Sequence, residues 1–92
     1  MIKIDIVHNQ AAMFLIRDLC QQHQIFGYSS MQVVSAFWPK FRVYDSDPTD
    51  PQYYTFIITP PNEVSEILRR LKENLGDDSR LFICTSPVEQ VH

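Results

Sequence analysis

The chain has 92 residues, of which 45% are hydrophobic, and its eight Lys and Arg against eleven Asp and Glu give a formal net charge of −3. This length fits one domain, residues 1–92, which buries only about 60% of its unfolded surface, so association with further copies would add stability. The sequence has no basic tract, which argues against nucleic acid as a partner, and no apolar run approaches the roughly 20 residues that span a bilayer.

The N-terminal sequence MIKIDIV lacks the order of basic, apolar and small residues that marks a signal peptide, so we expect a cytoplasmic protein. Cys20 and Cys84 have no zinc-type CxxC spacing. In a reducing compartment both are expected to be buried free thiols and not a disulfide.

The first half of the chain changes periodicity twice. Residues 1–7 alternate three isoleucines with Lys3 and Asp5, which predicts a strand with one buried face. Apolar residues then recur at helical spacing over 9–23, and Asn9 is placed to cap the first turn. The run 26–28 breaks this helix, and the β-rich residues 30–37 predict a second strand.

The second half repeats the pattern after a long loop. Residues 53–59 (YYTFIIT) predict a third strand covered on both faces. Asn62 is expected to cap a second helix that Gly76 ends in a left-handed conformation, and residues 80–84 predict a fourth strand. Charged residues four positions apart mark the solvent side of this helix, as the pairs Glu66 with Arg70 and Arg69 with Glu73.

This order of elements predicts an α+β fold, a ferredoxin-like βαββαβ sandwich with both helices on one face of an antiparallel sheet. The other face is expected to be too apolar for solvent alone, so we predict an oligomer that packs sheet against sheet. The apolar residues expected there are Val7, Ile57, Phe82 and either Val33 or Val34, among Lys3, Asp5 and Thr55.

The loop at residues 37–54 (FWPKFRVYDSDPTDPQYY) holds six of the eleven aromatic residues of the chain. Long loops with such a composition commonly carry function. The residues predicted to bind a target protein are Trp38, Phe41, Arg42 and Tyr44. Burial of these aromatics against a neighbouring subunit explains them equally well, whereas Tyr54 is assigned to the third strand and its core.

Two segments resemble the PII superfamily of signal proteins. Residues 27–29 (GYS), followed by MQVV, are similar to the entry of PII proteins into their second strand, and residues 77–83 (DDSRLFI) resemble their GDGKIFV turn and strand. The resemblance implies a homotrimer whose long loop is a T-loop that docks on a transporter or an enzyme. It also implies a small ligand between subunits, for which Ser29 and Arg80 are the residues carried over.

The sequence departs from the PII pattern at the nucleotide site. Residues 35–37 (SAF) stand where the family has GxG, and Asp77 and Ser79 replace glycines of the turn. Phosphates need close backbone approach, which glycine permits. These replacements argue against an adenine nucleotide as the cofactor and leave its identity unknown.

The resemblance extends to PII-like proteins associated with heavy-metal efflux, which raises a metal-sensor alternative. Cys20 and His23 lie three apart on the first predicted helix and His8 follows the first strand, so this set would suit a divalent metal such as zinc, copper or nickel. In the loop, Asp45, Asp47 and Asp50 offer oxygen ligands for calcium, although turn chemistry explains them more simply.

A small metal-dependent nuclease centred on Asp5, with His8 nearby, is a further alternative. The sequence has no P-loop, nucleophile elbow or HExxH motif, so we do not expect an enzyme. The favoured prediction is a PII-like regulatory or adaptor protein in signal transduction.

Overall fold

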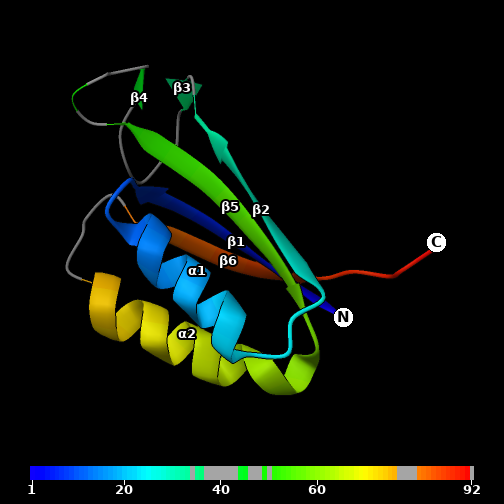
Figure 1. The fold of residues 1–92 in the computed structure, drawn as a ribbon. Helices are drawn as coiled ribbons and strands as arrows, with labels where there is room; N and C mark the ends of the chain where they lie inside the picture. The colour runs from blue at the N-terminus through cyan, green and yellow to red at the C-terminus, as the bar shows by residue number, and fades with distance from the viewer. Residues whose placement is uncertain (34, 37–43, 46–48, 50, 77–80, 92) are drawn as a thin grey trace.

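The computed structural model describes residues 1–33, 35–36, 44–45, 49, 51–76 and 81–91. Four antiparallel strands form a sheet in the order β2-β5-β1-β6, and two helices cover one face of it (Figure 1). The predicted ferredoxin-like βαββαβ fold is therefore confirmed. The elements are β1 (Ile2–Asn9), α1 (Ala12–Gln22), β2 (Gly27–Gln32), β3 (Ser35–Ala36), β4 (Tyr44–Asp45), β5 (Gln52–Thr59), α2 (Pro61–Leu75) and β6 (Phe82–Pro87).

The first strand and helix follow the sequence pattern closely. β1 extends to Asn9, two residues beyond the predicted end, and α1 begins at Ala12. The N-cap position is Ala11, not Asn9, and Ala11 makes no side-chain cap hydrogen bond. Asn9 still satisfies one free amide of the first turn, because its side-chain oxygen accepts a hydrogen bond of 3.1 Å from the Ala12 amide. β2 begins at Gly27, earlier than predicted, because the Phe26 amide already bonds the Ile58 carbonyl at 2.7 Å and starts the pairing with β5.

Both predicted ends of the second helix need correction. α2 begins at Pro61, not after Asn62, because a proline at the first helical position loses only an amide that has no intrahelical partner there. Gly76 does end the helix, but its φ of −62° is right-handed, so the predicted left-handed stop is wrong. The last strand begins at Phe82 and continues to Pro87.

The core lies between the sheet and the two helices. Its fully buried side chains come from β1, α1, β5 and α2, and each has an exposed fraction of 2% or less. They are Ile4, Ile6, Ala12, Ile16, Leu19, Ile57, Ile67 and Leu71. Branched side chains from β1 and β5 therefore pack against the apolar sides of α1 and α2.

The prediction from the sequence assigns the wrong residues of β5 to each face of the sheet, because its alternation is shifted by one residue. Ile57 lies opposite Ile4 and Thr55 lies opposite Ile6, so both belong to the face that the helices cover, and both are 0% exposed. Because every residue of YYTFIIT suits a strand, alternation alone does not decide which face is buried. Val7 and Phe82, which are opposite each other, lie on the other face as predicted.

Among the residues that the structure describes, no helix is long and apolar enough to span a membrane.

Candidate functional site

The face of the sheet away from the helices, here called the open face, is largely apolar. The prediction that this face is apolar is confirmed, but with other residues of β5. Tyr54, Phe56 and Ile58 lie there in place of the predicted Ile57 and Thr55. Met31 from β2 remains 46% exposed, and Val7 from β1 is 9% exposed. The large side chains of the open face are Val7, Met31, Tyr54, Phe56, Ile58 and Phe82.

A polar cluster lies within the open face. Lys3 Nζ is 3.3 Å from Asp5 Oδ1 and 5.3 Å from the centre of the Phe56 ring. The Tyr54 hydroxyl donates to the same Asp5 oxygen, and Cys84 Sγ lies 3.8 Å from Asp5 Oδ2. Tyr54 thus belongs to the predicted strand, but its assignment to the core is wrong. The predicted burial of Cys84 is wrong as well, because its side chain is exposed on β6.

The protonation of this cluster follows from its contacts. Hydrogen bonds with Tyr54 and Asp5 raise the pKa of Lys3. Burial raises the pKa of Tyr54 and of Cys84, and the Asp5 carboxylate raises both further. At neutral pH the cluster therefore holds an ammonium group, a phenol and a thiol, none of which is activated as a nucleophile.

The structure separates the two residues, Asp5 and His8, on which the nuclease alternative depends. Asp5 lies on the open face, whereas His8, three residues later on the same strand, lies on the face that the helices cover. The carboxylate and the imidazole therefore cannot act on one substrate.

His8 belongs to a buried chain of hydrogen bonds and is 1% exposed. Its Nδ1 lies 2.8 Å from the Asn9 carbonyl, which can only accept, so this nitrogen donates. Its Nε2 then accepts from the Thr55 hydroxyl at 2.7 Å, and Ser30 Oγ is 2.6 Å from the same Thr55 oxygen. The ring also stacks on Tyr53 with centroids 6.0 Å apart.

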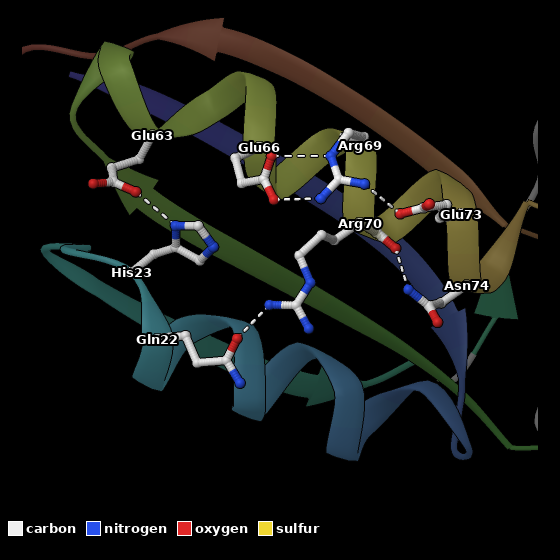
Figure 2. A network of polar contacts seen from close by, with 8 residues as sticks. All are labelled: Gln22, His23, Glu63, Glu66, Arg69, Arg70, Glu73 and Asn74. Carbon is white, nitrogen blue, oxygen red and sulfur yellow. Dashed lines mark hydrogen bonds and ion pairs between the residues drawn. The ribbon is translucent and has the colours of Figure 1, made fainter.

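The other two predicted metal ligands have separate environments. Cys20 is in the apolar core, where burial raises the pKa of its thiol to about 11. His23 Nδ1 lies 2.6 Å from Glu63 Oε2, at the point where the end of α1 approaches the start of α2 (Figure 2). Among the described residues no three His, Cys, Asp or Glu side chains are grouped as metal ligands, so Cys20, His23 and His8 do not form one site.

The two helices are joined by polar contacts on their outer side (Figure 2). Arg70 donates to the Gln22 side chain of α1, and does not form the predicted pair with Glu66. Glu66 instead contacts Arg69 at 2.5 Å, and Arg69 also bonds Glu73 at 2.6 Å, as predicted.

Ser29, the predicted ligand residue of β2, borders a pocket of about 540 Å³ that is open to solvent. Phe26, Tyr28 and Phe56 make much of its wall aromatic, and Glu89 is the one charged side chain among the lining residues that the structure describes. The remaining lining residues are Met1, Gly27, Ile58, Val88 and Gln90. A carboxylate and apolar walls do not favour a phosphate.

The segment between β2 and β5, residues 33–51, is here called the arm. Trp38, Phe41 and Arg42 lie outside the described residues, as do Asp47, Asp50, Val34 and Arg80. The backbones of Tyr44 and Asp45 form β4, which pairs with Ser35 and Ala36 of β3. This two-stranded ladder was not predicted, because each strand is too short for alternation to be visible.

A backbone hydrogen bond holds the base of the arm. The Val33 amide donates to the Gln52 carbonyl at 2.9 Å, directly after β2 ends and where β5 begins. The predicted loop therefore ends at Pro51, and Tyr53 and Tyr54 belong to the strand.

No protein-family model matches the sequence, and the search of curated proteins found no match. Two groups of solved structures have the same fold. CPII from Thiomonas intermedia K12, bound to ADP and bicarbonate, aligns over 97% of this chain and 88% of its own with a TM-score of 0.72 and 18% identity. CutA1 from Pyrococcus horikoshii aligns over 100% of this chain and 87% of its own, with a TM-score of 0.71 and 17% identity.

CPII is described as a nitrogen regulatory PII-like protein. The matches extend over nearly the entire chain and over most of each matched chain. The chain therefore has the fold of PII-like proteins and CutA1, as the resemblance in its sequence predicts.

Proposed function

We propose that the chain is a PII-like regulatory protein, a homotrimer assembled through its open face, that presents its arm to a target protein. The observation that carries this proposal is the apolar open face on a PII-like fold. In the single chain, Phe56 and Ile58 are only partly buried and Met31 is 46% exposed. Covering such a surface with other copies would remove apolar area from water.

Target binding is assigned to the arm because of its composition and its position. Trp38, Phe41, Arg42 and Tyr44 are residue types that dominate binding interfaces. β2 and β5 are adjacent in the sheet, so the two ends of the arm are held together at one place. The sheet would then act as a rigid support for a segment that contacts a transporter or an enzyme.

A small ligand between subunits would control the arm if it binds one arm conformation more tightly than another. Ser29, at the rim of the open pocket, is one proposed contact, and Arg80 is the other. CPII binds ADP and bicarbonate. The carboxylate of Glu89 in the lining disfavours anions, phosphate and bicarbonate alike, and the aromatic walls suit a neutral or cationic ligand with an apolar part.

Light scattering on the purified protein tests the assembly. We expect the mass of a trimer for the wild type and a smaller species for Phe56→Asp, which places a charge on the open face. The matched control is Phe14→Asp on α1, where the side chain is 72% exposed and away from the core. A monomeric wild type, or equal dissociation of both variants, would refute the assembly.

Affinity capture from the native cell tests the role of the arm. The double substitution Trp38→Ala and Tyr44→Ala should remove the target while the trimer mass stays unchanged. An unchanged set of captured proteins would contradict the assignment. Thermal shifts with ADP, bicarbonate and divalent metals test the ligand, since a ligand at a hundred times its dissociation constant stabilises the native state by about 2.7 kcal/mol.

A further inference from the structure

A histidine is buried at the place where the arm leaves the sheet. His8 lies opposite Tyr53 in β5, and Tyr53 lies opposite Gln32, the last residue of β2. The next pair is the Val33 amide with the Gln52 carbonyl, which forms the base of the arm. The His8 ring stacks on Tyr53, so its environment and the base of the arm depend on the same residue.

The ring is neutral in this arrangement. Nδ1 donates a hydrogen bond to the Asn9 carbonyl, and in the neutral ring Nε2 then accepts one from the Thr55 hydroxyl. A second proton on Nε2 would force Thr55 to reverse its hydrogen bond and to donate toward Ser30. The hydroxyl groups of Thr55 and Ser30 can reverse their hydrogen bonds in this way, but the positive charge of the protonated His8 ring stays buried.

The described surroundings offer this charge no counter-ion. From β5 the ring faces Tyr53 and Thr55, and from β2 the chain reaches Ser30. The buried residues of α1 are apolar apart from the Cys20 thiol, and those of α2 are Ile67 and Leu71. On β1 itself, Lys3 and Asp5 lie on the opposite face. A buried ion without a partner is costly, so the protonated ring favours any state in which water reaches it.

Water can reach the hydrogen bonds of His8, Thr55 and Ser30 from the side of Ser30, because Ser30 is only half-buried and lies on the edge strand β2. We infer that protonation of His8 is a pH-sensitive switch that opens the pairing of β2 with β5 at the base of the arm. The inference depends on the proposed function only for its consequence, a change in target binding. The conformational change itself belongs to the chain alone.

The direction of the effect follows from linkage. Burial lowers the pKa of His8 below its ordinary value of 6.5, and the hydrogen bond with the Asn9 carbonyl opposes this only in part. A ring that water reaches binds a proton more readily than the buried ring. The closed base is therefore fully stable above pH 6.5 and loses stability as the pH falls from 6.5 toward the lowered pKa.

Two measurements on the full chain test the switch. NMR follows the His8 and His23 imidazoles, and hydrogen exchange gives the protection of backbone amides, both between about pH 8 and about pH 5, the range in which histidine titrates. We expect the Val33 amide to lose protection as the pH falls, while core amides of α2 keep theirs. His23→Gln removes the other described histidine and should leave this response unchanged.

His8→Gln should abolish the pH response at Val33, and if that variant does not fold, the wild-type spectra decide. A His8 ring that titrates in the folded protein while Val33 keeps its protection would overturn the inference, as would a response that survives His8→Gln. Light scattering at each pH separates the two proposals. A trimer with a pH-insensitive base leaves the proposed function standing, and a monomer with a pH-sensitive base leaves this inference standing.

Discussion

Replacement of Ile57 by alanine should remove a large part of the stability of the domain. Ile57 is 0% exposed between β1 and the helices. The substitution deletes three carbons, which corresponds to about 2.4 kcal/mol of lost burial at about 0.8 kcal/mol for each. A residual cavity of roughly 50 Å³ would add about 1.2 kcal/mol at about 24 cal/mol per Å³. We therefore expect a loss of about 3.6 kcal/mol, against a total of roughly 5 to 14 kcal/mol for a chain of this length.

Urea unfolding followed by far-UV circular dichroism measures this loss. The matched control is Ile58→Ala, which deletes the same carbons from a partly buried side chain on the open face. The loss of unfolding free energy caused by Ile57→Ala should not depend on protein concentration. The loss caused by Ile58→Ala should grow with concentration, because other copies then cover the open face. A loss below about 1 kcal/mol at Ile57 would refute the assignment of faces in β5.

Three further outcomes follow from single residues. Thr59→Val should stabilise the chain by about 1 kcal/mol in urea unfolding, because Thr59 Oγ1 is buried without a hydrogen-bond partner among the described residues, and a loss would contradict this. Cys20, with a pKa of about 11, should react with thiol reagents only on unfolding, while the exposed Cys84 reacts in the folded monomer; rapid labelling of Cys20 would contradict its burial. Arg69→Ala should change stability little at any salt concentration, since its pairs are exposed, and a large loss would argue otherwise.

The elements of the fold could be predicted because their patterns are local. Ile2, Ile4 and Ile6 alternate over residues 2–6 of β1, and the apolar stripe of α2 repeats for four turns. Each pattern needs only the geometry of its own element, and the order of elements then leaves few topologies. The contact of Asn9 with the first turn of α1 is equally local, since it joins residues three positions apart.

The candidate site was harder to predict because its residues meet across strands. Lys3, Asp5, Tyr54 and Cys84 come from three strands, and only the register of the sheet brings them together. The buried chain of His8, Thr55 and Ser30 has the same origin. His8 was predicted as a metal ligand, because the sequence shows a histidine after a strand and does not show which face it occupies.

The amino-acid sequence by itself determined the order of strands and helices, the resemblance to PII proteins and the unusual composition of the arm. Only the tertiary structure decided which face each residue of β5 occupies and which partners His8, Tyr54 and Arg70 take. The physical reason is that a strand such as YYTFIIT is apolar at every position, so its face is chosen by the neighbours it pairs with.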